Sequence, residues 1–544
     1  MIMVMGKGIS VFSGVAVGKI QVYEKPSITE YQKAFDAAIE KQKYFQATQD
    51  AKKQLMDLFE KTKIEIGESE AMIIDVQMMM LDDQDFINGV LDMIGSQQCT
   101  VSYAVSETGK RCADLFSAMD DTYMQARALD VMDITNRLLA ILSGQDKLFQ
   151  LEQPAVIVAD DLTPSETIQF DKTKILAFVT RHGSANSHTA ILARTLNIPT
   201  LIQADIPIDT QLNGKPIAID GITGKFYIDP SNTVIEQLQN KQRVLSEQQD
   251  LLKKLKNKQS ITTDGKRINI YANISGPQDL NMVLENDSDG IGLFRSEFLY
   301  IGKPTYPTEE EQFDSYYKVV KAMNGKKVII RTLDIGADKK ADYFNLAPED
   351  NPAMGYRAIR ICLTKLDIFK TQLRAIYRAS AYGNVAIMFP MIISVEEIQK
   401  IKVIIKEVKA DLNSQNIAFG NVEIGIMIET PAAVMMSNEL AKEVDFFSVG
   451  TNDLTQYTLA IDRQNYTLEP FFNPHHPAVL KMLRIVVENA HANGIWAGIC
   501  GELASDFELT ETFIQMGYDE LSVSPIFTLA LRKIIRESKV TENE

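Results

Sequence analysis

The C-terminal half of the chain alternates short apolar runs with amphipathic segments, and this alternation limits the possible folds more than any other feature. Eight apolar runs have the character of β-strands: Ile268–Ile274, Gly290–Arg295, Val328–Asp334, Val385–Met391, Glu423–Glu429, Asp445–Asn452, Trp496–Glu502 and Leu521–Ser524. Segments with helical spacing lie between most of them: Thr308–Asn324, Phe369–Tyr382, Val395–Leu412, Pro431–Lys442 and Pro477–Asn493. Strands that alternate with helices are typical of a parallel sheet, and eight of them predict a (β/α)8 TIM barrel over residues 261–544. An open, doubly wound sheet is the alternative.

Charged and polar residues gather where these predicted strands end. In chain order they are Arg295, Glu297, Arg331, Asp334, Arg357, Glu429, Asn452, Asp453, Arg463, Cys500 and Glu502. The carboxyl ends of barrel strands form one rim, so we expect these side chains to meet there. Guanidinium groups bind phosphate and carboxylate oxygens through paired N–H groups, and several arginines at one rim predict a polyanion site. Glu429 and Asp453 add the oxygen ligands that Mg²⁺ prefers.

The N-terminal half has a different pattern of apolar and polar residues. Residues 8–23 have strand character, as do five later runs: Ala155–Ala159, Ile175–Val179, Thr200–Ile202, Pro216–Ile219 and Lys225–Ile228. Residues 29–143, which lie between them, contain no proline, and their spacing predicts helices at Glu30–Lys61, Glu68–Leu81 and Ala126–Leu142. The simplest arrangement is an α/β domain of residues 1–26 and 146–230, with a helical domain of residues 27–145 inserted into it. Residues 231–260 are expected to form a linker helix ahead of the barrel.

The last predicted helix of the insert carries Arg127, Asp130, Asp133 and Arg137 at the spacing of ion pairs along one face. We interpret this face as solvent-exposed.

Residues 183–199 form a small polar loop followed by an apolar helical stretch that ends at Pro199. Ser187 stands at the N-cap position, so His188 falls in the first turn of the helix. The unpaired N–H groups and the positive dipole end there disfavour an imidazolium and favour an anion attached to the ring, such as a phosphoryl group. A histidine without chemistry is the alternative. The converging rim residues favour the phosphoryl interpretation.

Composition excludes several classes of partner. The chain has 56 basic and 72 acidic residues, a formal charge of −16, and no Lys/Arg-rich run, which argues against nucleic acid and anionic membranes. No apolar stretch approaches the ~18 residues of a membrane span, and the first residues do not resemble a signal peptide. Neither a disulfide framework nor a zinc site is indicated by the four widely spaced cysteines, Cys99, Cys112, Cys362 and Cys500. A cytoplasmic protein without membrane insertion is expected.

His475 and His476, with no third ligand nearby, are interpreted as loop residues.

Several motifs resemble the PEP-utilising enzyme family, whose members act on phosphoenolpyruvate (PEP). The stretch Gly183-x-x-x-Ser-His-Thr-Ala-Ile-Leu-Ala-Arg is similar to its phosphohistidine signature. Six stretches are similar to its PEP-binding domain: Gly290-Ile-Gly-Leu-Phe-Arg-Ser-Glu, Arg331-Thr-Leu-Asp-Ile-Gly, Asn351-Pro-x-x-Gly-Tyr-Arg, Gly425-Ile-Met-Ile-Glu-Thr-Pro, Asp445-Phe-Phe-Ser-Val-Gly-Thr-Asn-Asp and Cys500-Gly-Glu-Leu-Ala. The order of the segments, with no ATP-grasp module ahead of them, resembles the enzyme I group of the bacterial PEP:sugar phosphotransferase system. The resemblance extends from Gly8 to Ile535.

The resemblance implies that His188 takes the phosphoryl group of PEP and passes it to a histidine of the carrier protein HPr, releasing pyruvate as the first step of sugar uptake. It implies roles for the rim residues as well: PEP binding by Arg295, Arg331, Arg357, Asn452, Asp453 and Arg463, Mg²⁺ binding by Glu429 and Asp453, and protonation of the enolate by Cys500. The α/β domain would be a swivelling phosphohistidine domain, the helical insert would dock HPr, and the barrel would form a homodimer. We expect the rim cations to lower the pKa of the Cys500 thiol.

Three positions depart from the family pattern: Ser184 and Ala337 replace glycines, and Gln77 replaces a common histidine of the HPr-facing helix. The last change leaves the detailed HPr contacts open. Pyruvate,phosphate dikinase and PEP synthase share the histidine and the barrel, but they need an ATP-binding domain for which the sequence has no candidate. A nitrogen-branch enzyme I would carry an additional N-terminal sensory domain. A non-catalytic PEP sensor would need neither the nucleophile His188 nor the acid Cys500.

Overall fold

The computed structural model describes residues 3–12, 14–23, 31, 33–34, 36–65, 68–118, 122–144, 151–163, 166–167, 170–183, 193, 198–301, 303, 305–336, 341–463, 465, 468 and 471–540. The chain forms two compact units, Met1–Gln248 and Gln249–Glu544. Ser184, His188 and Ala337 lie outside the described residues.

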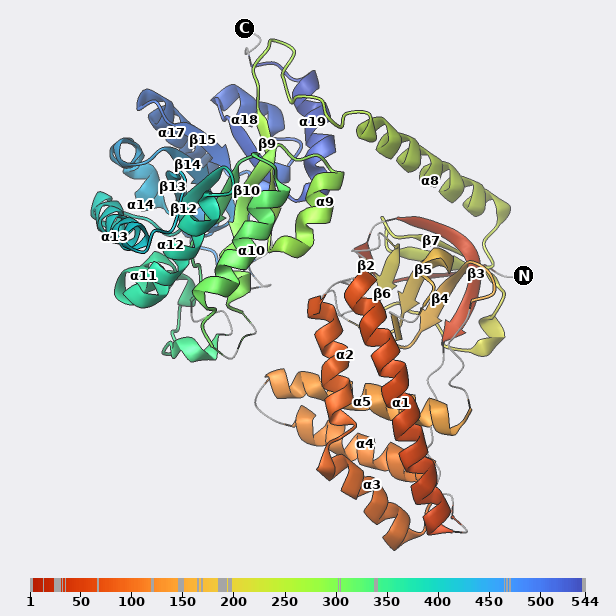
Figure 1. The fold of residues 1–544 in the computed structure, drawn as a ribbon. Coiled ribbons are helices and arrows are strands. Elements are labelled where there is room, and N and C mark those ends of the chain that lie inside the picture. Colours follow the sequence, from red (N-terminus) through yellow and green to blue (C-terminus); the bar gives the residue numbers. More distant parts are fainter. Residues whose placement is uncertain are drawn as a thin grey trace. The chain divides into compact units, whose positions relative to one another are not determined.

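The second unit contains a closed barrel of eight parallel strands that follow one another in chain order (Figure 1). The strands are β9 (Asn269–Ile274), β10 (Gly290–Arg295), β11 (Val328–Arg331), β12 (Val385–Phe389), β13 (Glu423–Ile428), β14 (Phe446–Val449), β15 (Trp496–Ile499) and β16 (Glu520–Val523). Pairing of Leu521 with Ile270 joins the last strand to the first. This closure confirms the TIM barrel and excludes the open sheet. Several strands are shorter than predicted, so that Asp334 and Asn452 lie in the segments that follow β11 and β14.

Helices surround the barrel in the same view. They are α9 (Leu280–Glu285), α10 (Glu309–Ala322), α11 (Ile359–Thr364), α12 (Leu366–Ser380), α13 (Val395–Ser414), α14 (Pro431–Met435), α15 (Ser437–Leu440), α16 (Thr451–Leu459), α17 (Pro477–Ala492), α18 (Thr510–Met516) and α19 (Thr528–Glu537). Capping boxes fix the starts of α10 and α13, where Thr308 pairs with Glu311 and Ser394 with Glu397. The single helix predicted at Pro431–Lys442 is interrupted at Met436, which has φ −96° and ψ 9°.

Large side chains fill the amino-terminal end of the barrel interior. The rings of Phe446 and Trp496, at the first positions of β14 and β15, stack with 4.5 Å between their centroids. Lys327 lies over the Trp496 ring, 5.0 Å from its centroid, and its ammonium group donates to both carboxylate oxygens of Glu423. A barrel packed in this way leaves its carboxyl-terminal rim for binding.

The first unit contains a mixed sheet of eight strands in the order β1-β8-β7-β3-β4-β5-β6-β2. The strands are β1 (Val4–Lys7), β2 (Ile9–Phe12), β3 (Val15–Tyr23), β4 (Ala155–Ala159), β5 (Ile175–Thr180), β6 (Thr200–Ile202), β7 (Pro216–Asp220) and β8 (Lys225–Ile228). Strand β3 pairs with both β4 and β7, so the first strands rejoin those that follow the helical insert, as predicted. Helix α8 (Asn232–Lys253) follows the sheet.

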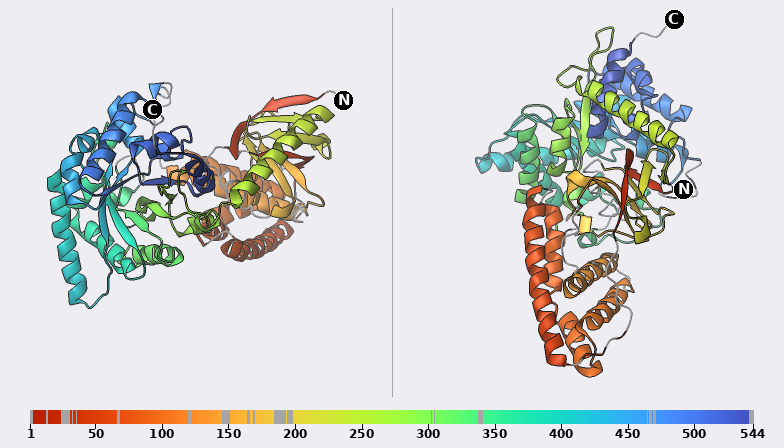
Figure 2. Two further views of the ribbon diagram at one scale, coloured as in Figure 1. Left: turned by 90° about the horizontal axis from the view of Figure 1, so that it is seen from above. Right: turned by 90° about the vertical axis from the view of Figure 1, so that its right-hand side faces the viewer.

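The helical insert contains α1 (Ala37–Glu65), α2 (Glu68–Met80), α3 (Gln84–Gln97), α4 (Val101–Ser117) and α5 (Thr122–Leu142). Helices α1 and α2 lie side by side in Figures 1 and 2. The predicted start of α1 at Glu30 is too early, because the Asp36 carboxylate accepts from the Ala38 backbone N–H, at 2.8 Å, and begins the helix there.

The charged face of α5 is only partly exposed, so its interpretation as a solvent-exposed face is wrong for Asp133. That residue is 3% exposed, and its carboxylate accepts from Gln77 Nε2 at 2.7 Å and from Thr163 Oγ1 at 2.9 Å. Arg127 and Asp130 form the predicted kind of ion pair, at 3.0 Å. Gln77 is itself 1% exposed, so it contributes to the packing of α2 on α5.

Within the described ranges, no helix combines the length and the apolar character needed to cross a membrane.

Candidate active site

A cavity of about 870 Å³ is lined by residues at the carboxyl ends of the barrel strands. It is lined by all eight barrel residues to which the resemblance assigns a role: Arg295, Arg331, Arg357, Glu429, Asn452, Asp453, Arg463 and Cys500. Side chains that end or follow five of the strands thus meet at one rim. His188 lies outside the described residues.

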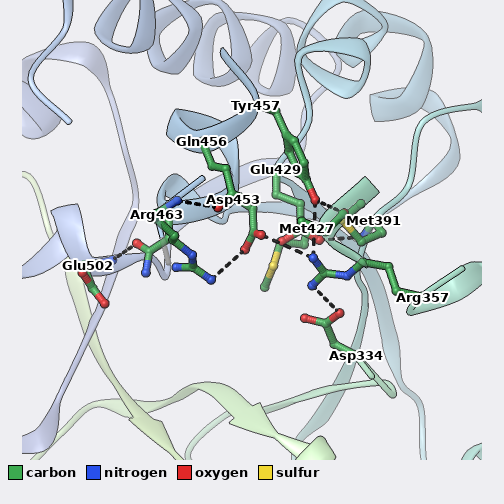
Figure 3. Close-up of polar contacts among 12 residues, drawn as sticks. Asp334, Arg357, Met391, Met427, Glu429, Asp453, Gln456, Tyr457, Arg463 and Glu502 are labelled. Carbon is green, nitrogen blue, oxygen red and sulfur yellow. Dashed lines mark hydrogen bonds and ion pairs between the residues drawn. The ribbon is translucent and has the colours of Figure 1, made fainter. Parts of the chain in front are cut away.

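Two buried arginines are held rigidly by carboxylates. Arg331, at the end of β11, places Nη2 2.6 Å from Glu297 Oε1 and Nη1 3.0 Å from Asp334 Oδ2. Arg357 donates through Nη2 to Asp334 Oδ1, at 2.8 Å, and its Nη1 lies 3.6 Å from Asp453 Oδ1 (Figure 3). Burial opposes the charge of both arginines, but the neighbouring carboxylates outweigh it and raise the pKa of each above its usual value. Both therefore stay cationic in a fixed orientation.

The other two arginines are held less tightly. Arg295 donates through Nη2 to Ser275 Oγ, at 3.1 Å, and its guanidinium carbon lies 5.0 Å from the centroid of the Phe298 ring. The Nε of Arg295 is buried and finds no partner among the described residues. Arg463 Nη2 lies 3.6 Å from Asp453 Oδ2. These two side chains keep N–H groups available for a ligand.

Glu429 is fully buried, and only one of its two carboxylate oxygens has a hydrogen-bond partner among the described residues. Its Oε1 accepts from the Met391 backbone N–H at 2.6 Å, whereas its Oε2 has no partner among the described residues (Figure 3). Burial, and next the charges of Asp453 and Asp334, raise the pKa of Glu429 to about 8. An unpaired carboxylate oxygen beside a second carboxylate fits a divalent cation, whose charge would favour the carboxylate form and lower the pKa of Glu429 again.

The charge balance of the cavity differs from the cation-rich rim expected from the sequence. Four arginines line it, but so do seven acidic residues: Glu297, Asp334, Asp350, Glu429, Asp453, Asp462 and Glu502. A polyanion would meet net repulsion here unless a cation accompanied it. Among the described residues, no group of three or more His, Cys, Asp or Glu side chains is arranged to hold a metal. Mg²⁺ needs only one or two carboxylates, because substrate oxygens and waters complete its shell.

Cys500 directly follows β15 and is 4% exposed. Its thiol donates to the Val449 carbonyl oxygen at 3.6 Å. Burial raises the pKa of Cys500 to about 12, although Ser448 and Arg331 both act to lower it. The expectation of a lowered pKa is therefore wrong: moving a thiolate out of water costs more than the cation returns. At neutral pH the group is a thiol, which can donate a proton.

This raised pKa predicts the alkylation behaviour of Cys500. We expect its rate of modification by iodoacetamide to keep rising with pH up to about pH 10, since only the thiolate reacts. In urea-unfolded protein the same rate should level off above about pH 8.5, the ordinary cysteine pKa. Peptide mass spectrometry would follow both rates, and a plateau near neutral pH in the folded protein would contradict the assignment. The group also favours folding below its unfolded pKa and loses that contribution as the pH rises toward 12.

Several cavity residues escaped the sequence reasoning, among them Asn273, Ser522 and Tyr457. Asn273 Nδ2 donates to the carbonyl oxygens of Cys500, at 3.1 Å, and Ser522, at 3.2 Å, and both Asn273 and Ser522 line the cavity. They belong to the first and eighth strands, whose ends the strand-end argument did not include. Tyr457, on α16, accepts from Arg357 Nη1 at 3.4 Å. No sequence signal distinguishes it, because its position depends on how α16 packs.

Comparison with known proteins gives matches over most of the chain. Three family models match: PEP-utilising enzyme, PEP-binding domain, over residues 249–540; PEP-utilising enzyme, N-terminal, over residues 7–127; and PEP-utilising enzyme, mobile domain, over residues 151–224. The phosphoenolpyruvate-protein phosphotransferase of Haemophilus influenzae is 41% identical over 538 residues, covering 98% of this chain and 94% of that protein. The protein of the same name from Bacillus subtilis is 39% identical over 542 residues, covering 99% and 95%. The chain therefore belongs to the PEP-utilising enzyme family.

Proposed function

We propose that this chain transfers the phosphoryl group of PEP to its own His188 and then to a histidine of HPr, with release of pyruvate. The observation that carries the proposal is the barrel cavity. It is lined by arginines that carboxylates hold in place, by Glu429 and Asp453, and by the protonated thiol of Cys500, and Glu429 Oε2 has no hydrogen-bond partner among the described residues. The relatives named phosphoenolpyruvate-protein phosphotransferase, which align with nearly the whole chain, support it.

The arginines bind and orient the substrate. PEP carries a phosphate and a carboxylate, and Arg295, Arg331, Arg357 and Arg463, with Asn452, offer N–H groups to both. Phosphoryl transfer passes through a loose, in-line transition state, so positioning and charge stabilisation supply most of the catalysis. Because Arg331 and Arg357 are already held by carboxylates, they need no reorganisation as charge moves during the reaction.

Glu429 and Asp453 would hold Mg²⁺, as the free Oε2 of Glu429 and the excess of acidic residues suggest. When bound, the ion supplies positive charge that polarises phosphoryl and enolate oxygens. Asp453 would also contact PEP in this arrangement.

Cys500 would donate the proton that converts the enolate into pyruvate. Attack of neutral His188 on phosphorus releases the enolate of pyruvate, whose carbon takes the proton of the Cys500 thiol. The cavity position of Cys500 and its protonated state at neutral pH support this role.

The remaining parts of the proposal concern the first unit. Residues 1–26 and 146–230 would form the swivelling domain that carries His188, the linker 231–260 would allow it to move between the barrel and HPr, and the helical domain 27–145 would dock HPr.

A cytoplasmic location and a homodimer formed through the barrel belong to the same proposal.

The test combines the protein with PEP, Mg²⁺ and candidate HPr proteins. We expect pyruvate and acid-labile phospho-HPr to form together, and EDTA to stop both. With HPr omitted, pyruvate should stop at one equivalent per chain. PEP binding without any pyruvate would indicate a sensor, and a requirement for ATP would indicate a dikinase.

A further inference from the structure

Asn273 lines the barrel cavity, and none of the steps above gives it a role. It lies near the end of β9, and its amide nitrogen donates to two backbone carbonyl oxygens, that of Cys500 at 3.1 Å and that of Ser522 at 3.2 Å. An asparagine amide has two N–H groups, so each carbonyl takes one of them. The amide group is therefore fixed in orientation by the backbone that surrounds it.

These two hydrogen bonds join three strands at the carboxyl end of the barrel. Asn273 belongs to the first strand, Ser522 to the eighth, and Cys500 directly follows the seventh, β15. The last register pair between β15 and β16 is Ile499 with Leu521, so the Cys500 carbonyl group lies beyond that pair. The Asn273 side chain thus extends the hydrogen bonding of the barrel by one residue, to the residue that carries the thiol.

The peptide group between Cys500 and Gly501 is held at both ends. Its carbonyl oxygen accepts from Asn273, and its N–H group, which belongs to Gly501, donates to the Val449 carbonyl oxygen at 3.3 Å. The chain also passes close to the start of α16 here, since a Cβ atom on Gly501 would lie 2.1 Å from Thr451 Oγ1 and 2.5 Å from the Thr451 nitrogen. The plane of this peptide group is therefore fixed, and Asn273 supplies one of its two hydrogen bonds.

The peptide group that precedes Cys500 is fixed as well. The Cys500 N–H donates to the same Val449 carbonyl oxygen at 3.1 Å. When both adjoining peptide groups are fixed, the direction of the Cα–Cβ bond is fixed too, and only rotation about that bond remains. The contact of the thiol with the Val449 oxygen, at 3.6 Å, favours one of its rotamers. Asn273 thus acts on the direction of the thiol through the backbone.

We propose that Asn273 is a positioning residue for proton transfer, which fixes the Cys500 backbone so that the thiol meets one face of the enolate. The inference rests on the proposed function. In that step the S–H bond of Cys500 breaks as a C–H bond forms on the enolate carbon, and the thiolate then takes a proton from water. Water can protonate a planar enolate from either face, whereas a thiol held on one side reaches only one. Asn273 therefore determines the stereochemistry of the step as well as its rate.

The test is Asn273→Ala, supplied with HPr, Mg²⁺ and PEP that carries deuterium and tritium at known positions on its methylene carbon. The pyruvate is reduced at once to lactate, so that its methyl group does not exchange with water. The wild-type protein should give a chiral methyl group, because the third hydrogen arrives from one side. The variant should give a largely racemic one, because water protonates the enolate that the misplaced thiol misses. Its steady turnover should be about 10- to 100-fold slower, as for a misplacement of about 1 Å.

Asn286→Ala is the matched control. Asn286 is also partly buried and donates through Nδ2 to a backbone carbonyl oxygen, that of Met282, at 2.9 Å, but it lies at the end of α9 and does not line the cavity. Its replacement should change neither the chirality nor the rate. If Asn273→Ala fails to fold, Asn273→Ser must give the racemic product, because one short hydroxyl cannot donate to both carbonyl oxygens.

The stereochemical result separates positioning from a merely structural role. An Asn273 variant that turns over slowly but still gives a chiral methyl group would overturn the inference, as would wild-type turnover with a chiral product. A racemic methyl group from the wild-type protein, or a chiral one from Cys500→Ala, would instead refute the proposed role of Cys500.

Discussion

Replacing His188 with alanine is expected to abolish phosphoenzyme formation and leave PEP binding to the barrel intact. The arginines, carboxylates and thiol that would bind PEP all belong to the unit Gln249–Glu544, whereas His188 belongs to the other. Loss of the nucleophile removes the acceptor without changing the binding cavity. Labelling with radioactive PEP would measure the first effect, and calorimetric titration with PEP and Mg²⁺ the second.

His182→Ala is the matched control for this experiment. His182 precedes the same loop, its side chain is 65% exposed, and its Nδ1 lies 3.2 Å from Asp160 Oδ1. Its removal should leave labelling at the wild-type level. Acid-labile label that persists in His188→Ala would show that another histidine is the acceptor.

Replacing Arg331 with methionine is expected to damage both turnover and stability. The change removes a cation from the cavity and leaves Glu297 Oε1 and Asp334 Oδ2 without the partner they have at 2.6 and 3.0 Å. Loss of one preorganised charge of this kind costs about 10²- to 10³-fold in turnover. Breaking a buried pair from one side costs about 3–5 kcal/mol in the free energy of unfolding, which urea titration would measure.

Arg374→Met separates the effect of the site from that of ion pairing in general. Arg374 also contacts two carboxylates, Glu309 and Asp411, but it lies on α12 and does not line the cavity. Its replacement should reduce stability by less, because Asp411 is 49% exposed, and should leave turnover unchanged. Arg331→Lys should restore part of the stability but not the turnover, since an ammonium group lacks the planar fork. Wild-type turnover in Arg331→Met would exclude Arg331 from the PEP site.

The pattern of apolar and polar residues along the chain predicted the barrel and the starts of its strands. The eight barrel strands start within a residue of their predicted positions and differ mainly in where they end. Some charged residues of the rim, such as Arg331, Asp334 and Glu429, lie within the predicted runs. They could not locate the strand ends, because a polar side chain is compatible with the last strand residue and with the loop. The segment Pro431–Lys442 shows the same limit, since nothing in its periodicity marks the interruption at Met436.

The sequence by itself determined that a parallel barrel forms and that Arg331, Glu429 and Cys500 come to one rim, because periodicity and strand ends are properties of neighbouring residues. Only the tertiary structure decided their ionisation and partners. Cys500 is a thiol because the closed barrel buries it, and Glu520 enters the interior because Gly292 and Gly498, far from it in the chain, leave room. Desolvation and Coulomb interaction depend on distances in space, which the order of residues along the chain does not specify.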